Sequence, residues 1–553
     1  MWNSKFESKS SVPKAINGEI CKQKIANLFA DYFAESCTAN SASKSTELLN
    51  EYEHLKQSVS SNCKQSDMTF STELVDHVIR DLKLGKAAGA DSITAEHLTH
   101  AHPIVVTLLT SIFNIMLHYE YVPNDFGVGL TFPVPKGPQS NSTPTVENYR
   151  GITISPIISK VFEYCLLNRY HNLLNCSNRQ FGFKKNSSVS HAVFSLRKTI
   201  EYFIEKDSTV NICTLDMAKA FDKMNWYSLF SKLIKRNCPL KFVNVLECWY
   251  SKSNTTVKWG DCLSRSVQLL AGLRQGGILS PFLFAIYVDD ILTKLQDSGL
   301  GCHIKYVCFN SYMYADDLLL LSISVCDLQK MVNLCNDELV SIDMRINTGK
   351  SACLRIGPPF NKFVSNITIN NCCIQWINEI KYLGIYVMSA KNFVINNHAA
   401  KVKFFRSVNG ILSKISYNQN TDAALSLISS FALPTLTFGL EACNLTRAQA
   451  DRLAYPFNSV FMKIFSSFNK DVIALCQFYT GFLPLQNMLD VKVFNFLNNL
   501  SNAKDKSCPA SILHNWFGAR ESNRIADKYN ICVTDSKYIR SRKVWAFFEG
   551  TVL

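Results

Sequence analysis

Two short apolar runs without a helical period limit what this chain can fold into. One covers residues 210–215 and leads directly into Asp216. The other covers residues 318–324 and directly follows the pair Asp316-Asp317. Residues 306–314, which precede this pair, have the same strand-like composition. Apolar runs of about four to eight residues bounded by polar positions are typical of strands buried inside a sheet. We therefore predict a strand that ends at Asp216 and a hairpin with Asp316-Asp317 at its tip.

Helices accompany these strands in the predicted fold. Ser280-Pro281 is the start signal of a helix that continues over residues 282–296 and stops at Gly299. Amphipathic stretches at residues 23–33 and 71–84 predict two more helices, and the pattern beyond residue 386 is helical again. That last region carries spaced basic residues, namely Lys401, Lys403, Arg406 and Lys414. The mixture of strands and helices indicates an α/β fold.

One uncharged segment, residues 97–119, is long enough to be tested as a membrane span. Its polar residues recur every three or four positions and form a stripe along one helix face: Thr107, Thr110, Ser111, Asn114 and His118. Pro103 near the start and Pro123 beyond the end are the usual boundaries of a helix in a water-soluble protein. We predict a mostly buried core helix, with a membrane span as the alternative.

Charge and composition limit the classes of function. The 553 residues carry a formal net charge of +14, which favours a polyanionic partner, either nucleic acid or an acidic membrane face. A hydrophobic content of 47% excludes a disordered chain. None of the 20 Cys forms a C-x-x-C pair, and the first 24 residues are polar and charged. These features favour a reducing intracellular location, without secretion and without a membrane partner.

The candidate catalytic residues are Asp216, Asp316 and Asp317. Carboxylates from separate strands can hold two Mg²⁺ ions about 3.5–4 Å apart, the arrangement used for in-line phosphoryl transfer. One ion lowers the pKa of an attacking hydroxyl, and the other holds a triphosphate and stabilises the leaving oxygen. The alternative for an isolated Asp-Asp pair is a plain polar turn.

A second copy of the same pattern provides an internal comparison. Residues 287–290 read Tyr-Val-Asp-Asp, the same Tyr-x-Asp-Asp form as residues 314–317. The first copy lies within the helix predicted after Ser280, where adjacent carboxylates would form its solvated side. Only the second copy is flanked by apolar strands, so we select it as the candidate site.

A series of short motifs lies in one order between residue 84 and about residue 386. Before Asp216 they are KAAGAD (86–91), FPVPK (132–136), NYRGI (148–152) and QFGF (180–183). Then follow LDM (215–217) with AFD (220–222), GLRQGG (272–277) with Ser280-Pro281, YADD (314–317), residues 347–351 and YLG (382–384). In this order they resemble the motifs of reverse transcriptases, and they are most similar to those of non-LTR (LINE-type) retrotransposons.

This resemblance implies a right-hand polymerase fold with fingers, a palm that carries an antiparallel sheet, and a helical thumb. It implies an N-terminal extension over 1–83, fingers and palm over 84–388 (core about 117–388), a helical thumb over 389–470 and a helical C-terminal region over 471–553. The implied activity is RNA-directed DNA polymerisation, in which a primer 3′-OH attacks a dNTP on an RNA template. The implied cofactor is a pair of Mg²⁺ ions, or Mn²⁺ in their place.

The resemblance also implies a role for each matching residue. Metal ions would be held by Asp216, Asp316, Asp317 and the backbone carbonyl of Met217. The incoming nucleotide would be contacted by Lys136, Arg150, Gln275 and Gly276, and by Phe221, whose ring would exclude a ribose 2′-OH. Lys350 is the candidate general acid for pyrophosphate, and the primer grip would be Tyr382, Leu383 and Gly384.

Several of these roles have a simpler alternative. Lys136 and Arg150 could be solvated loop charges, Phe221 could be a core aromatic residue, and Lys350 could be a surface lysine. The sequence also departs from the family pattern, with Gly151 and the pair Ala88 and Ala90 where Pro is common and Gly277 where Asp is frequent. None of these departures removes an implied metal ligand or phosphate contact.

Two absences bear on the rest of the polypeptide. The 83 residues before the first motif are too few for the endonuclease domain of this group, and Cys508, His514 and Cys532 are too scattered for its terminal Cys/His knuckle. We therefore expect a fragment or degraded copy of an element, a separate endonuclease, and a ribonucleoprotein of nucleus or cytoplasm. The alternatives are a non-catalytic, polymerase-derived nucleic-acid-binding protein and a group II intron maturase, which residues 86–91 disfavour.

Overall fold

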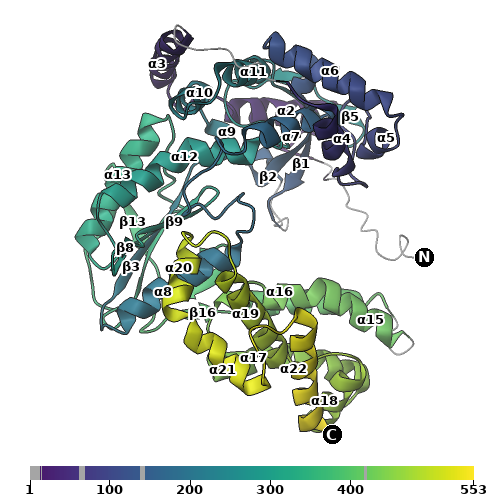
Figure 1. Ribbon diagram of the computed structural model, residues 1–553, viewed down its shortest axis with the longest axis vertical. Coiled ribbons are helices and arrows are strands. Elements are labelled where there is room, and N and C mark those ends of the chain that lie inside the picture. Colours follow the sequence, from purple (N-terminus) through teal and green to yellow (C-terminus); the bar gives the residue numbers. More distant parts are fainter. Residues whose placement is uncertain (1–12, 14, 61–68, 138–143, 416–419) are drawn as a thin grey trace.

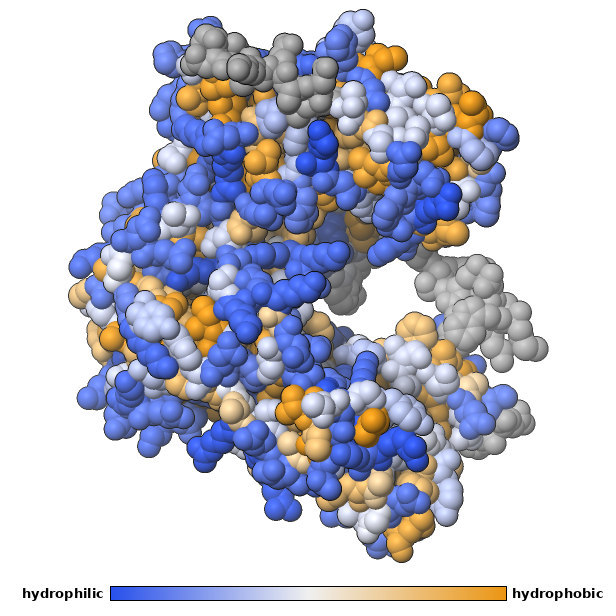
Figure 2. All heavy atoms as spheres, in the orientation of Figure 1, coloured by the Kyte–Doolittle hydropathy of each residue, from blue (hydrophilic) through white to orange (hydrophobic). Residues whose placement is uncertain are grey.

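The computed structural model describes residues 13, 15–60, 69–137, 144–415 and 420–553. These residues form three blocks (Figure 1). The upper block contains the N-terminal helices and a five-stranded sheet, the middle block contains a six-stranded sheet with its helices, and the lower block contains the C-terminal helices. Figure 2 shows that the molecule is hollowed between the upper and lower blocks.

The six-stranded sheet has the strand order β12-β13-β11-β3-β10-β9. Its strands are β3 Val210–Asp216, β9 Ser311–Tyr314, β10 Asp317–Ser322, β11 Ala352–Ile356, β12 Ile367–Ile369 and β13 Cys372–Trp376. Neighbours are antiparallel except β11 and β13, which are parallel. The predicted strand that ends at Asp216 and the predicted hairpin are confirmed. The first hairpin strand is shorter than expected, because β8 (Val307–Cys308) pairs instead with β7 (His303–Ile304).

Both faces of this sheet are buried. The helices around it are α8 Val189–Ile204, α12 Ser280–Asp297 and α13 Val325–Ser341. Leu318 and Leu320 of β10 lie in the core formed with α12 and α13, whereas Leu319 and Leu321 lie in a second core formed with α8. Successive side chains of a strand point to opposite faces, so a strand buried on both sides reads as a continuous apolar run. This is why the run after Asp317 has no period.

The five-stranded sheet forms the upper block. Its strands are β1 Val128–Pro135, β2 Tyr149–Ile154, β4 Asn254–Trp259, β5 Cys262–Leu263 and β6 Val267–Gln268. β1 is antiparallel to β2 and parallel to β4. Helix α2 (Lys22–Ser36) covers it, with the ring of Phe29 5.1 Å from that of Tyr149 and 5.0 Å from that of Trp259. The N-terminal segment is thus packed into the upper block.

The remaining elements connect and extend these blocks. The helices of the upper and middle blocks are α3 Ala42–Ser60, α4 Thr72–Arg80, α5 Ala95–Thr99, α6 Ile104–His118, α7 Ile157–Tyr170, α9 Ala220–Lys223, α10 Trp226–Lys235 and α11 Leu240–Ser251. A three-stranded sheet comprises β14 Glu379–Tyr382, β15 Ile385–Met388 and β16 Val394–Asn396. The C-terminal helices are α14 His398–Leu412, α15 Thr421–Leu427, α16 Leu433–Thr437, α17 Arg447–Phe465, α18 Lys470–Tyr479, α19 Leu485–Ser501, α20 Pro509–Phe517, α21 Ala519–Tyr529 and α22 Lys537–Val552.

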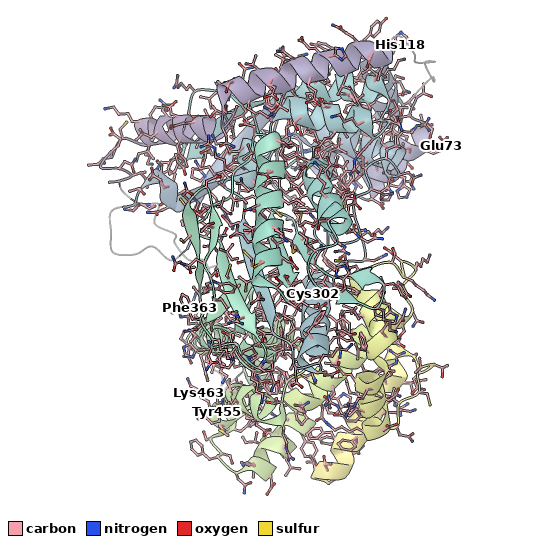
Figure 3. All side chains as sticks on the ribbon, turned by 90° about the vertical axis from the view of Figure 1, so that its left-hand side faces the viewer. Glu73, His118, Cys302, Phe363, Tyr455 and Lys463 are labelled. Carbon is pink, nitrogen blue, oxygen red and sulfur yellow. The ribbon has the colours of Figure 1, made fainter. Side chains whose placement is uncertain are left out.

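The prediction of a mostly buried helix within residues 97–119 is wrong for one face of α6. This helix lies along the outer side of the upper block, with His118 at its outer end (Figure 3). Ile104 and Leu108 are 53% and 56% exposed, whereas the polar Thr110 is buried and Asn114 hydrogen-bonds the backbone of Phe70. The buried face of α6 is mostly apolar and consists of Leu109, Thr110, Phe113, Met116 and Leu117. Its exposed face mixes apolar residues with the polar Thr107, Ser111 and His118. Among the described residues, no helix has the length and apolar character needed to cross a bilayer.

Candidate active site

The ends of two adjacent strands bring the three predicted aspartates together. Asp216 is the last residue of β3 and lies directly opposite Asp317, the first residue of β10. Ala315 and Asp316 form the tight turn that joins β9 to β10, and Ala315 has a positive φ of 56°. The turn thereby presents Asp316 next to the facing strand ends, as predicted.

Gln180 fixes this turn, and the sequence reasoning missed its role. Its buried Oε1 accepts hydrogen bonds from the backbone N–H groups of Gly182 (2.9 Å) and Ala315 (3.0 Å), and its Nε2 donates to the Ala315 carbonyl. A Cβ on Gly182 would lie 2.4 Å from the Ala315 nitrogen, so only glycine allows this approach. The available signal was the QFGF motif, in which a glutamine precedes a glycine by two positions.

The three carboxylates share a negative charge that is only partly compensated. Desolvation raises the pKa of Asp317 to about 6, and the charges of Asp316 and Asp216 add to this rise. Desolvation also raises the pKa values of Asp316 and Asp216. Nζ of Lys350 lies 4.0 Å from Oδ2 of Asp216 and opposes the rise there. Carboxylates this close favour a bound cation, because a cation removes their mutual repulsion.

The backbone at Met217 is directed towards the same place. The Asp216 carbonyl accepts from the N–H of Asn347, and the N–H of Ala218 donates to the Arg345 carbonyl, so both bond to the strand on one side. Carbonyls alternate in direction along an extended chain. The carbonyl of Met217 therefore points to the other side, where β10 begins.

The donor set fits a hard divalent cation. Carboxylate and carbonyl oxygens are the ligands preferred by Mg²⁺. In the part of the chain that the structure describes, no three His, Cys, Asp or Glu side chains already stand in a metal-holding arrangement. The three aspartates therefore provide suitable donor atoms, but in this structure they are not grouped as a ready metal site.

The fingers-side residues approach this site from the upper block. Lys136 follows β1, and its Nζ donates to the Glu147 carbonyl at 2.7 Å. Arg150 is exposed on the paired strand β2, opposite Val134. Burial lowers the pKa of Lys136, and the positive charges of Lys350 and Lys219 lower it further. Lys136 and Lys350 thus lie near each other although they come from different blocks.

The residues predicted to contact the base and sugar lie between the two sheets. Nε2 of Gln275 donates to Oδ1 of Asp222 at 2.8 Å. Gly276 has a φ of 80°, and a Cβ there would lie 2.3 Å from the Thr153 carbonyl. The half-buried ring of Phe221 lies 4.6 Å from that of Phe284. Phe221 also makes an edge contact with the ring of Phe183 at 6.1 Å, so it is packed between two aromatic residues and remains partly exposed.

The predicted primer grip forms the turn between β14 and β15. Tyr382 ends β14, and Leu383 and Gly384 adopt positive φ values of 48° and 88°. Burial raises the pKa of Tyr382 well above its usual value, and the charge of Asp317 adds to this effect. This turn thus lies beside the aspartates.

The second Tyr-x-Asp-Asp copy differs from the prediction of a solvated side. Asp289 is buried in α12, where it accepts from Arg236 at 2.5 Å and from the N–H of Ser177 at 2.7 Å. Asp290 pairs with Lys232 at 2.6 Å. The prediction that residues 287–290 lie in a helix is confirmed. Their two carboxylates are neutralised by Lys232 of α10 and by Arg236, which follows α10.

Part of this chain matches a known protein-family model. Residues 134–387 match the model described as reverse transcriptase (RNA-dependent DNA polymerase). A probable RNA-directed DNA polymerase from transposon BS of Drosophila melanogaster is 24% identical over 57% of this chain and 35% of its own length. The RNA-directed DNA polymerase from mobile element jockey of Drosophila funebris is 24% identical over 58% of this chain and 35% of its own.

A third relative belongs to another element. The Pol polyprotein from type-2 retrotransposable element R2DM of Drosophila melanogaster is 23% identical over 65% of this chain and 33% of its own. The chain thus spans about a third of the length of these relatives. A structure of telomerase from Candida albicans is 11% identical, with a TM-score of 0.37 over 66% of this chain and 67% of that one. The similarity to reverse transcriptases therefore rests on the match of residues 134–387 and on the transposon relatives.

Proposed function

We propose that this chain is an RNA-directed DNA polymerase, because residues 134–387 match the reverse transcriptase model and the chain is similar to polymerases of transposable elements. It extends a primer 3′-OH with dNTPs on an RNA template. The observation that carries the proposal is the register of β3 and β10, which sets Asp216 opposite Asp317 beside the turn that holds Asp316. The charge of +14 supports a nucleic-acid partner.

The aspartates would hold the catalytic metal. Asp216, Asp316, Asp317 and the Met217 carbonyl are the proposed ligands for two Mg²⁺ ions. When bound, these ions supply Lewis acidity to the attacking hydroxyl and to the leaving phosphate oxygen. The raised pKa values of Asp316 and Asp317 support this assignment, since they come mainly from desolvation, with a further contribution from neighbouring carboxylates that a cation would offset.

The surrounding residues would position the other reactants. Lys136 and Arg150 bind the triphosphate from the fingers, and Arg150 offers a guanidinium fork suited to phosphate. Gln275 and Gly276 would line the nucleotide site where the protein backbone comes close to the nucleotide. The ring of Phe221 would lie against the sugar. Lys350 is close enough to the aspartates to protonate the leaving pyrophosphate. The turn Tyr382-Leu383-Gly384 directs the primer end to the site.

We assign fingers and palm to residues 84–388, the thumb to 389–470 and a separate helical region to 471–553. The spaced basic residues of the thumb would follow the template–primer backbone. A separate endonuclease and a ribonucleoprotein of nucleus or cytoplasm belong to the same proposal.

Primer extension tests the proposal directly. The purified chain is mixed with an RNA template, an annealed DNA primer, dNTPs and Mg²⁺, and parallel reactions omit the template or contain EDTA. We expect template-dependent extension that EDTA abolishes and that Asp216→Asn lacks. Template–primer binding without any extension would support a non-catalytic nucleic-acid-binding protein instead.

A further inference from the structure

The last turn of α2 reaches the nucleotide side of the proposed active site. Nζ of Lys219 donates to the buried Ser36 hydroxyl at 2.9 Å and lies 5.1 Å from the centre of the Tyr32 ring. Lys219 precedes α9 and lies between Met217 and Phe221 in the chain, with a positive φ of 48°. Figure 1 shows α2 and α9 where the upper block meets the middle one. An N-terminal helix thus holds a lysine of the first palm motif.

A second lysine, one helical turn further on, differs in its partners. Nζ of Lys223 donates to the Thr38 carbonyl at 3.0 Å and to the Thr38 hydroxyl at 3.2 Å, which ties it to the segment after α2. Lys219 instead donates to a neutral hydroxyl and lies over an aromatic face. Its charge opposes the rise that burial causes in the pKa of Asp222 and helps to lower the pKa of Glu147, so these carboxylates lie near it, but no hydrogen bond joins either of them to Lys219 among the described residues. Lys223 therefore attaches the segment after α2 to α9. The ammonium group of Lys219 is held in place, and its charge can still bind an anion.

Three ammonium groups from separate elements converge at this place. The positive charges of Lys350 and Lys219 both lower the pKa of Lys136, so each of these two side chains lies near Lys136. Asp222 and Glu147 partly offset this effect. Lys136 comes from the end of β1, Lys219 from the start of α9, and Lys350 from the loop before β11. Converging lysines repel one another unless a polyanion joins them. A triphosphate carries enough charge to do so.

We propose that Lys219 is a third phosphate-binding residue for the incoming triphosphate, and that Ser36 and Tyr32 are positioning residues that hold its ammonium group. The inference rests on the proposed polymerase function and extends it to the N-terminal helix. A lysine already held by its neighbours loses little side-chain freedom when the phosphate binds, which strengthens binding. Helix α2 is therefore part of the nucleotide site.

The competing explanation is that Lys219 only attaches α2 to the middle block. The variants Lys219→Met and Lys223→Met separate the two, because both keep an aliphatic stem and both lose a contact with the α2 segment. We expect Lys219→Met to raise the KM for dNTP about tenfold with little change in kcat, as for the loss of a charge-assisted hydrogen bond. Lys223→Met should lower Tm and leave this KM unchanged. Lys219→Arg should restore most of the affinity, and Ser36→Ala should give a smaller rise in KM.

A binding measurement without catalysis keeps the inference separate from the polymerase proposal. Inorganic tripolyphosphate in EDTA should raise the Tm of the wild type and of Lys223→Met, and raise that of Lys219→Met clearly less. Equal shifts in all three proteins, or an unchanged dNTP KM in Lys219→Met, would overturn the inference. If tripolyphosphate binds through Lys219 but no protein extends primers, the anion site stands and the polymerase function fails.

Discussion

Residues 287–290 and 314–317 share the form Tyr-x-Asp-Asp but occupy opposite environments. In α12, Asp289 and Asp290 are neutralised by Arg236 and Lys232. At the β9–β10 turn, the carboxylates face one another, and the pKa of Asp317 is raised to about 6. The helical pair contributes to stability, whereas the turn pair costs stability and keeps charge available for a ligand. The difference comes from the elements that carry the pattern and from their tertiary partners.

The largest expected effect is the loss of activity in Asp316→Asn, which keeps the shape of the side chain and removes its charge. Primer extension should fall at least about a thousandfold, since the residue would act as one unit with its metal partners. Template–primer affinity, measured by filter binding, should change little. An equal loss of template–primer binding would assign Asp316 a structural role. Residues 314–317 would then not differ in function from residues 287–290.

Asp289→Asn should produce the opposite result. The guanidinium of Arg236 loses its carboxylate, so the free energy of unfolding should fall by about 2 kcal/mol or more. Primer extension per folded molecule should stay within a few-fold of the wild type. Chemical denaturation measures the change in stability, and an activity assay at matched folded concentration measures primer extension. An inactive but stable Asp289→Asn variant would show that residues 287–290, not residues 314–317, carry the catalytic carboxylates.

Phe221→Ala tests whether a nucleotide pocket lies beside residues 314–317, the Tyr-x-Asp-Asp pattern at the β9–β10 turn. Removing the ring makes room for a 2′-OH, so discrimination against rNTPs should fall well over tenfold, or more than about 1.4 kcal/mol. The measured quantity is the ratio of rNTP to dNTP incorporation at matched folded protein. Because the ring also packs on Phe284, Tm should fall too. A lower Tm with an unchanged ratio would leave Phe221 as a packing residue only.

Gln180→Leu tests the rigidity of the turn. The N–H groups of Gly182 and Ala315 lose their acceptor, so Asp316 is held less firmly. We expect kcat to fall about tenfold with primer–template affinity retained. Gln477→Leu is the matched control, since it removes another buried glutamine remote from the turn in sequence. A similar fall in kcat for both variants would show a general loss of stability rather than a local effect.

The smallest effect concerns pH. A carboxyl whose pKa is raised in the folded state destabilises the fold once it ionises. This destabilisation is absent below the ordinary Asp pKa of about 4 and complete above about 6 for Asp317. In EDTA, Asp317→Asn should therefore raise Tm by a few degrees at pH 7.5, and the gain should vanish towards pH 4. A loss of Tm at pH 7.5 would show that Asp317 is stabilising, as Asp289 is.

The local sequence pattern predicted the strands and helices of the site better than it predicted which distant side chains contact the site residues. The strand ending at Asp216, the hairpin and the helix beginning near Ser280 depend on nearby residues, and all three are confirmed. The burial of Asp289 depends on Arg236, which lies 53 positions away and left no local signal. The same holds for Lys219, whose partner Ser36 is 183 positions away. The roles of the nucleotide-binding and primer-grip residues stay predictions.

The strand order of the central sheet has a consequence for synthesis. β3 pairs only with β10 and β11 in this sheet, and β10 begins at Asp317, about a hundred residues after β3 has ended at Asp216. At about 5–20 residues per second, the ribosome needs roughly 5–20 s to supply the first neighbour. During that time a strand that is mostly buried in the folded protein has two unpaired edges, which makes the nascent chain prone to aggregation. Chaperone demand should therefore peak while residues 217–317 are being translated.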